Sequence, residues 1–367
     1  MAKLCLYFNH PSQYREEIYN HINKTFTADW YFEKSDLNIV SFDINELHNP
    51  SWLEIKKLGG FYWTKGLMKL LRMDYDTYLM IGATRCLSLY FFLILKNLFF
   101  RKKKVLLWTH GYYGKESWVE KNIFKRPLFK MSDVVLVYGN YSRDLMIDDG
   151  FDPNNVSTIH NSLAYSKQLE LRNKATDSDI YAKHFGNDNP VLIFIGRLTP
   201  VKQLDMIIDA LYILKNKGEN YNLVYVGDGP ERKVLEDKAL DLGLSDRVWF
   251  YGACYDEVQN AELVYNADLC VAPGNIGLTV IHSLMFGCPA VTHNDFKWQM
   301  PEFEAIRKGV TGDFFESGNV HDLLNVISSW FSSHKDDRES VRSACYQEID
   351  EQWNPEFQIN VLKQVIK

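Results

Sequence analysis

Short apolar runs alternate with longer amphipathic stretches along the chain, a pattern typical of parallel strands joined by helices. The predicted strands are Leu4–Phe8, Trp30–Phe32, Thr77–Ile81, Val105–Trp108 and Val134–Tyr138, then Val191–Ile195, Leu223–Val226, Val248–Phe250, Leu269–Ala272 and Ala290–Thr292. The predicted helices are Tyr14–His21, Thr64–Arg72, Cys86–Phe99, Leu204–Asn216, Glu231–Leu242, Asp256–Tyr265, Leu278–Phe286 and Val320–Phe331. The sequence therefore predicts an α/β fold.

The strand and helix scheme occurs twice, which with a length of 367 residues predicts two domains. A polar stretch between Ser166 and Asn189 precedes a fresh buried strand and predicts the boundary. We expect a first domain of residues 1–170, a second of residues 171–350, and a helix in residues 351–367 that packs back toward the first domain. Asn354 and Pro355 are typical of a helix cap and of a first helical turn.

The charge of the chain is unevenly distributed. Residues 1–165 carry 21 Lys and Arg against 17 Asp and Glu, whereas the remainder carries 20 against 30 and brings the net charge to -6. An acidic second half argues against a nucleic-acid-binding protein. The six cysteines are scattered without metal-ligand spacing, so we expect buried, reduced thiols.

The apolar stretch Leu87–Leu95 is about half as long as a membrane-spanning helix and ends at Lys96. No signal peptide precedes the first predicted strand, so we expect a cytoplasmic location. Four cations, Arg101, Lys102, Lys103 and Lys104, follow the stretch. Two interpretations stay open for them: peripheral contact with anionic lipid at the inner face of the membrane, or the solvated end of a buried helix.

The strongest candidate site follows the strand Val191–Ile195. Gly196 ends the strand, and Arg197 and Lys202 come before the next helix. Ligands bind at the carboxyl edge of open parallel sheets, and a guanidinium with an ammonium there can neutralise a diphosphate. The alternative is a connecting loop with two solvated cations.

Two further loops have the same setting, after a strand and before a helix. The first contains Gly227, Asp228 and Gly229, whose glycines allow a ligand to approach the backbone. In the second, a glycine-rich turn leads into a helix near Leu278, and free N–H groups at such a helix start bind anions. One turn along that helix, His282 can present a ring nitrogen to a ribose or a phosphate. Ordinary turns and a packed histidine are the alternatives.

In the first half, two aromatic loops follow predicted strands. One contains His110, Tyr112 and Tyr113, and the other contains Asn9, Tyr14 and Arg15. Such side chains offer hydrogen bonds and stacking faces to sugars, although both segments can also be ordinary loops.

Two other classes of site are disfavoured. No G-x-G-x-x-G follows the first strand, which argues against a dinucleotide-binding dehydrogenase. The D-x-D matches at residues 74–76 and 177–179 lead into a strand and lie in the linker, so neither is expected to hold a metal. We predict no metal and no cofactor.

From Val191 to Gly312 the chain resembles the nucleotide-sugar site of the family 4 retaining glycosyltransferases. The resemblance is carried by Gly196-Arg197-Leu198-x-Pro-x-Lys202, Gly227-Asp228-Gly229-Pro230, Phe250-Tyr251-Gly252, Ala267-Asp268, Gly277-Leu278, Gly287-Cys288-Pro289, Pro301-Glu302 and Gly309-Val310-Thr311-Gly312. The first half is less similar, through Thr109-His110-Gly111, Ser132-Asp133 and Ile159-His160-Asn161-Ser162.

The resemblance implies the GT-B fold, in which two Rossmann-like domains with parallel sheets face a central cleft. It implies a retaining hexosyltransferase that moves a sugar from a UDP-sugar, rather than a GDP-sugar, to a glycan or lipid-linked saccharide in the synthesis of bacterial surface polysaccharide or glycoconjugate. Arg197 and Lys202 would hold the diphosphate, and His110 would lie near the transferred sugar. The implied donor-binding residues are Gly196, Gly227, Asp228, Gly229, Tyr251, Gly252, Asn275, Ile276, Gly277, Leu278 and His282. The implied acceptor-side residues are Asn9, Tyr14, Arg15, Tyr112 and Tyr113.

One departure from the family concerns two glutamates eight positions apart, of which the first meets the donor sugar and the second the ribose. This chain has Gly274 and His282 there, so Asn275 and His282 are the expected substitutes. Two other functions stay open: a sugar-nucleotide epimerase of the same fold, and a non-catalytic protein that binds a glycan or another transferase.

Overall fold

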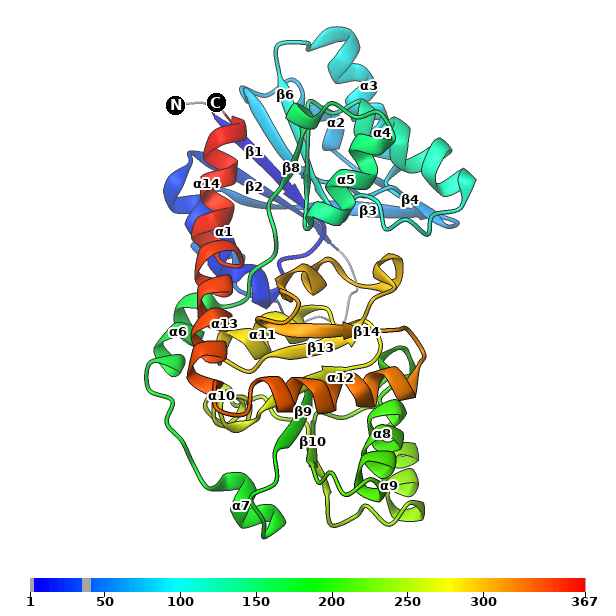
Figure 1. Ribbon diagram of the computed structural model, residues 1–367. Coiled ribbons are helices and arrows are strands. Elements are labelled where there is room, and N and C mark those ends of the chain that lie inside the picture. Colours follow the sequence, from blue (N-terminus) through cyan, green and yellow to red (C-terminus); the bar gives the residue numbers. More distant parts are fainter. Residues whose placement is uncertain (1–2, 35–40, 367) are drawn as a thin grey trace. The chain divides into compact units, whose positions relative to one another are not determined.

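The computed structural model describes residues 3–34 and 41–366. The chain forms two compact units (Figure 1), the first made of residues 1–164 and 354–367 and the second of residues 165–353. The boundaries predicted at residues 170 and 350 lie close to these divisions. None of the helices in the described part of the chain is long and apolar enough to cross a bilayer.

The first unit is built on a sheet with the strand order β4-β3-β2-β1-β5-β6-β7-β8. Its strands are β1 (Leu4–Phe8), β2 (Ala28–Lys34), β3 (Pro50–Leu58), β4 (Phe61–Thr64), β5 (Thr77–Ile81), β6 (Lys104–Thr109), β7 (Val134–Val137) and β8 (Val156–Thr158). All neighbours pair in parallel except β3 and β4, which form an antiparallel hairpin at one edge. The five strands predicted in this half are confirmed, and β3, β4 and β8 are additional.

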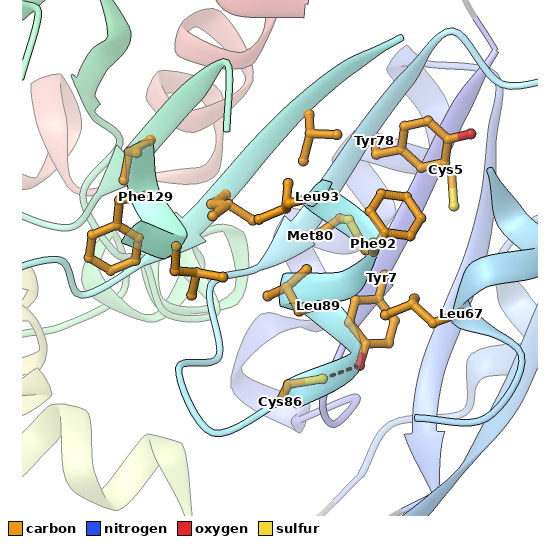
Figure 2. Close-up of a cluster of buried hydrophobic side chains, with 14 of the residues drawn as sticks. Cys5, Tyr7, Leu67, Tyr78, Met80, Cys86, Leu89, Phe92, Leu93 and Phe129 are labelled. Atoms are coloured by element: carbon orange, nitrogen blue, oxygen red, sulfur yellow. Dashed lines mark hydrogen bonds between the residues drawn. The ribbon is translucent and has the colours of Figure 1, made fainter. Parts of the chain in front are cut away.

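The helices of the first unit are α1 (Glu16–Thr25), α2 (Leu67–Leu70), α3 (Leu87–Phe99), α4 (Arg126–Lys130), α5 (Asn140–Asp148) and α14 (Pro355–Ile366). The helix predicted for Thr64–Arg72 is wrong in its first turn, because Thr64 ends a strand and Gly66 has a left-handed φ of 87°. A buried cluster joins α3 to one face of the sheet (Figure 2), where Phe92 and Leu93 pack beside Tyr78 and Met80. This face is therefore the base on which α3 rests.

The last helix, α14, packs against α1 on the other face of the first sheet. Its start has the predicted cap, since the side chain of Asn354 accepts a hydrogen bond from the backbone N–H of Phe357 at 2.9 Å. Gln358 donates to the carbonyl of His160 at 3.0 Å and accepts from the Ser162 hydroxyl at 2.8 Å. These buried bonds explain why the chain's end belongs to the first unit.

The second unit has a six-stranded sheet in the order β11-β10-β9-β12-β13-β14, and every neighbouring pair in it is parallel. Its strands are β9 (Val191–Ile195), β10 (Asn222–Val226), β11 (Val248–Gly252), β12 (Leu269–Ala272), β13 (Ala290–His293) and β14 (Gly312–Phe315). Its helices are α6 (Tyr165–Arg172), α7 (Ile180–Phe185), α8 (Asp205–Asn216), α9 (Arg232–Asp241), α10 (Glu257–Asn266), α11 (Leu278–Met285), α12 (Val320–Ser333) and α13 (Arg338–Gln352). The predicted strands and helices of this half are confirmed, whereas α6 and α7 occupy the stretch predicted as a linker.

A buried carboxyl group lies where β2 and β4 end in the first unit. Glu33 is 3% exposed and accepts hydrogen bonds from the hydroxyls of Tyr7 and Thr64, the latter at 2.8 Å. Burial raises the pKa of Glu33, although these hydrogen bonds act in the opposite direction. The folded protein therefore holds this proton more tightly than an unfolded chain would.

This shift predicts a pH-dependent effect of Glu33→Gln. Below the ordinary pKa of about 4.3, wild-type Glu33 is protonated in both the folded and the unfolded state. As pH rises from there through the raised pKa of the folded state, the wild-type protein loses stability. The variant carries no such proton, so its free energy of unfolding relative to wild type should increase across this window and then level off. Urea unfolding at a series of pH values measures the difference. Glu54→Gln is the matched control, because the hydrogen bond from Lys65 lowers the pKa of Glu54 and its stabilisation is instead lost as pH falls.

Candidate functional site

Three loops of the second unit meet at the carboxyl edge of adjacent strands. Gly196 and Arg197 follow β9, Gly227–Pro230 follow β10, and residues 273–277 follow β12. The chain builds the sheet from β9 outward to β11, then returns to place β12 on the other side of β9. This reversal makes the edge at β9 and β12 a topological switch point, the position where open α/β sheets bind ligands.

Backbone hydrogen bonds join the β9 loop to the β10 loop, and the β10 loop to the end of β11. The N–H of Leu198 donates to the carbonyl of Asp228 at 3.0 Å, and the N–H of Gly227 donates to that of Gly252 at 2.8 Å. A Cβ atom on Gly227 would lie 1.9 Å from the carbonyl oxygen of Gly196, so only glycine allows this approach. The Asp228 carboxylate accepts from the Gly229 N–H at 2.7 Å and pairs with Arg232 at 3.5 Å, which fixes the turn.

The two predicted cations differ in their surroundings. Arg197 is exposed, and no hydrogen bond or ion pair joins its side chain to another described residue. Lys202 is half-buried, and its ammonium donates to the backbone carbonyl of Asn275 at 2.6 Å and to the side-chain oxygen of Asn275 at 2.9 Å. Burial lowers the pKa of Lys202, and the charge of buried Glu302 raises it. Arg197 is thus free to meet an anion, while Lys202 links the β9 and β12 loops.

The turn before α11 is fixed by a buried glutamine that the sequence did not single out. Gln299 accepts the backbone N–H of Ile276 at 2.9 Å and donates to the hydroxyl of Thr292 at 2.8 Å. Ile276 is buried and its N–H is occupied, so it is not available to a ligand. Gly277 has a φ of 54°, and α11 begins at Leu278, so the N–H groups of the first turn lie at this edge.

His282, one turn along α11, lies next to a carboxylate from another helix. Its Nε2 atom is 3.6 Å from Oε2 of Glu257 in the first turn of α10, and Gln168 of α6 reaches the same oxygen at 3.5 Å. His282 lowers the pKa of Glu257, which keeps this group ionised. The two residues are 25 positions apart in sequence, so no local pattern could pair them.

Tyr251 and Gly252 end β11, the outermost strand on one side of the sheet. The Tyr251 hydroxyl donates to Gln259 of α10 at 2.7 Å. This bond turns Tyr251 toward α10. Among residues 3–34 and 41–366, no three His, Cys, Asp or Glu side chains are grouped as metal ligands. The independence from metal stays a prediction.

In the first unit, the two predicted aromatic loops meet at Tyr138. The ring of His110 lies 4.8 Å from that of Tyr138, whose hydroxyl accepts a hydrogen bond from the Arg15 guanidinium. Burial, with the charges of Arg15 and Lys125, lowers the pKa of His110 to about 4. Its buried Nδ1 atom has no hydrogen-bond partner among the described residues. The loops thus present a neutral imidazole with one unused ring nitrogen.

The other predicted acceptor-side residues have different environments. Tyr14 is exposed and accepts a hydrogen bond from Arg15 at 3.2 Å, and Asn9 is exposed at the end of β1. Tyr113 is half-buried, with its ring 5.9 Å from that of His110. Tyr112 differs from the prediction: it is buried at 2% exposure, and its hydroxyl donates to Asp149 at 3.0 Å inside the unit.

A buried ion pair fixes the loop that carries His110. The carboxylate of Glu116 accepts the backbone N–H groups of Tyr113 and Gly114 at 2.6 and 2.9 Å, and pairs with Lys125 at 2.7 Å. Lys125 also donates to the carbonyl of Gly111 at 3.0 Å. Neither Glu116 nor Lys125 was singled out in the sequence, because both roles depend on the folded loop.

Comparison with known proteins places these sites in context. Residues 177–347 match the model of a family described as glycosyl transferases group 1. A GDP-mannose-dependent alpha-(1-6)-phosphatidylinositol dimannoside mannosyltransferase of Mycobacterium tuberculosis is 39% identical over 141 residues, which are 38% of this chain and 35% of that protein. A putative glycosyltransferase, EpsD, of Bacillus subtilis is 30% identical over 37% of this chain and 35% of its own length. The chain thus spans about a third of the length of these curated relatives.

Solved structures match the whole chain. The Anabaena Alr3699/HepE structure in complex with UDP has a TM-score of 0.71 at 18% identity and is covered fully, as is this chain. The apo form of the lipopolysaccharide outer core galactosyltransferase WaaB has a TM-score of 0.73 at 12% identity, with 99% of both chains covered. At these identities the likeness concerns the fold.

Proposed function

We propose that the protein is a glycosyltransferase that transfers a sugar from a nucleoside diphosphate to a saccharide acceptor. The proposal is supported by the match of residues 177–347 to the group 1 glycosyl transferase family model and by the GT-B fold. The observation that carries the proposal is Arg197, an exposed guanidinium without a partner among the described residues, at the switch point of a parallel sheet. Such a group suits a ligand whose negative charge grows during the reaction.

We assign the diphosphate to Arg197, Lys202 and the first turn of α11. Lys202 already contacts Asn275, so a diphosphate that replaces or extends this contact would join the β9 and β12 loops. As the bond between the anomeric carbon and the phosphate oxygen breaks, these cations stabilise the charge on the leaving group. Binding energy is thereby concentrated on the transition state.

For the donor we propose a UDP-sugar, and a GDP-sugar is the alternative. Thermal unfolding with each nucleotide, described below, distinguishes them. UDP is supported by the ligand of Alr3699/HepE, which matches the full chain. GDP is supported by the name of the mycobacterial relative, which matches 38% of this chain at the higher identity of 39%. Tyr251 and Gly252 are assigned to the base in either case.

For the ribose we propose the pair of His282 and Glu257. The family's glutamate is absent at position 282, and the carboxylate of Glu257 lies 3.6 Å from the imidazole that replaces it. An imidazole and a carboxylate together offer the donor and acceptor groups that two vicinal hydroxyls need. Asn275, adjacent to Lys202, is assigned to the donor sugar.

We propose a retaining front-face displacement onto a glycan or lipid-linked saccharide acceptor, in the synthesis of a surface polysaccharide or glycoconjugate. The acceptor oxygen forms the new bond to the anomeric carbon on the face from which the phosphate leaves. Its proton passes to the departing phosphate oxygen, so no side chain is needed as a base. The neutral imidazole of His110 is assigned a hydrogen bond to the transferred sugar.

Thermal unfolding with nucleotides tests the donor site. At a hundredfold excess over its dissociation constant, UDP should stabilise the second unit by about 2.7 kcal/mol. Stabilisation by GDP and not by UDP would show that the donor carries guanine. An absence of any shift with either nucleotide would contradict the donor site and favour a non-catalytic binding protein. Incubation with UDP-N-acetylglucosamine alone separates a transferase from an epimerase, since only the latter forms an epimer without acceptor.

A further inference from the structure

Helix α3 is apolar on both of its faces. The inner face, with Leu89, Phe92 and Leu93, is buried against the first sheet. The outer face carries Phe91, Ile94, Leu98 and Phe99, of which Phe91 is 53%, Leu98 57% and Phe99 71% exposed. A helix that is apolar all round is usually covered on every side, so this outer face lacks a cover within the described chain.

The segment before α4 also carries exposed apolar side chains. Trp118 is 71% exposed, and Val119 and Ile123 are also exposed. The end of this segment lies beside α3, since the Tyr90 hydroxyl donates to the carbonyl of Phe124 at 3.1 Å. A second hydrogen bond, from Asn97 to the carbonyl of Met131 at 2.8 Å, holds the end of α4 beside α3. We call Phe91, Ile94, Leu98, Phe99, Trp118, Val119 and Ile123 the apolar surface.

Positive charge predominates in two segments of this surface, whereas the segment that carries Trp118 also contains Glu116 and Glu120. Residues 87–104 contain five Lys and Arg and no Asp or Glu, and residues 55–73 contain the same numbers of basic and acidic residues. The second segment includes β4 and α2, which pack against α3, and Trp63 of β4 lies 5.3 Å from the ring of Phe91. Lys56, Lys57, Lys69, Arg72, Arg101 and Lys102 are exposed.

Two of the four cations for which lipid contact was one interpretation have other roles. Lys103 donates to the carbonyls of Met73 and Tyr75, each at 2.8 Å, and Lys104 donates to that of Val365 at 2.6 Å. Both ammonium groups therefore bind backbone carbonyls of the first unit. Arg101 and Lys102 stay exposed next to Phe99.

We propose that the apolar surface binds the interface of an anionic lipid bilayer, with Phe99 and Trp118 inserted among the acyl chains. Exposed aromatic side chains flanked by Lys and Arg are the features of an interfacial membrane site. Each cation near an anionic surface strengthens binding about fivefold. A second copy of the chain fits less well, because a symmetric contact would bring the same basic segments face to face.

The test uses the full chain and vesicles of phosphatidylcholine, alone or mixed with phosphatidylglycerol. We expect flotation with the mixed vesicles only, weakened by added salt. The double variant Phe99→Ser/Trp118→Ser should bind at least about tenfold more weakly, and Arg101→Glu/Lys102→Glu likewise. Leu240→Ser is the matched control, since Leu240 is 66% exposed on α9 of the second unit, and should bind as wild type.

A second readout reports the insertion itself. Brominated lipid should quench the tryptophan emission of the wild-type protein. The quenching should be smaller in Trp118→Phe, because this variant lacks the inserted tryptophan. Wild-type protein that does not float, or variants that float as wild type does, would overturn the proposal. The proposal would also be overturned if the wild-type protein were a dimer and Phe99→Ser/Trp118→Ser were a monomer. UDP binding by the same variants should be unchanged, which separates this result from the outcome for the donor site.

Discussion

Replacing Arg197 by alanine should lower turnover by a hundred- to a thousandfold while the protein stays folded. Arg197 is exposed and bonds to no described side chain, so its removal should cost little stability. Its expected contribution is to the growing charge of the diphosphate, and loss of one such electrostatic contact typically costs about 3–4 kcal/mol in the transition state. The measurement is kcat with a UDP-sugar and acceptor, beside thermal unfolding without ligand.

Two further variants make this result specific. Arg197→Lys keeps the charge but loses the planar fork, so it should retain more activity than Arg197→Ala. Lys233→Ala, which removes an exposed cation paired with Asp237 on α9, should turn over as wild type does. Near-normal turnover by Arg197→Ala would refute the assignment of the diphosphate to the β9 loop.

Lys202→Ala should have a similar effect on rate for a partly different reason. Its ammonium bridges to Asn275, so the variant also loosens the β12 loop and should unfold at a lower temperature than Arg197→Ala. The contrast between the two cations was not visible in the sequence. Their spacing predicted that both lie at one sheet edge, but which of them is already bonded depends on how the β12 loop folds back.

The parts of the fold that the sequence predicted best are the buried strands. Val191–Ile195 and Leu269–Ala272 have the predicted bounds, because a short apolar run with a glycine or proline behind it has few alternatives in a parallel sheet. The hairpin of β3 and β4 was missed because it lies at the sheet edge and carries Lys56 and Lys57 on exposed positions. A polar strand of this kind has no burial signal along the chain.

The site was predictable where a residue acts within its own loop and not where it acts through another element. The glycines of the β9, β10 and β12 loops could be placed at one edge because each loop follows a predicted parallel strand. Glu257 and Gln299 could not, since each meets its partner only after distant segments pack together. Glu116 was missed although its partner Tyr113 lies in the same loop, because the contact depends on how that loop folds. Tyr112 shows the reverse case, where an aromatic residue in a promising loop turns inward and bonds to Asp149.

The structure explains why position 274 is a glycine, which the sequence alone did not. The position appeared as the loss of a glutamate, yet a Cβ atom there would lie 2.0 Å from the carbonyl oxygen of Val201 and 2.7 Å from the Cα of Lys202. The N–H of Gly274 also donates to the carbonyl of Lys202 at 2.9 Å. The β9 loop therefore lies directly against this residue, and no side chain fits between them.

Introducing a glutamate by Gly274→Glu should therefore not supply a carboxylate for the donor sugar. The new side chain must displace the segment that carries Lys202, and overpacking of this kind costs about 1–3 kcal/mol. We expect Gly274→Glu and Gly274→Ala both to be destabilised by about this amount and to lose most of their activity, because the contact between Lys202 and Asn275 is disturbed in each. Urea unfolding and turnover measure the two effects.

Gly60→Ala is the matched control, since a Cβ atom there meets nothing within 4 Å. Its free energy of unfolding and its turnover should stay close to the wild-type values. A Gly274→Glu protein that is as stable as wild type and turns over faster would show that the β9 loop yields. The close packing of Gly274 would then not be the reason for the missing glutamate. If instead both Gly274 variants fail while Gly60→Ala does not, the glycine is part of the geometry that holds Lys202 at the sheet edge.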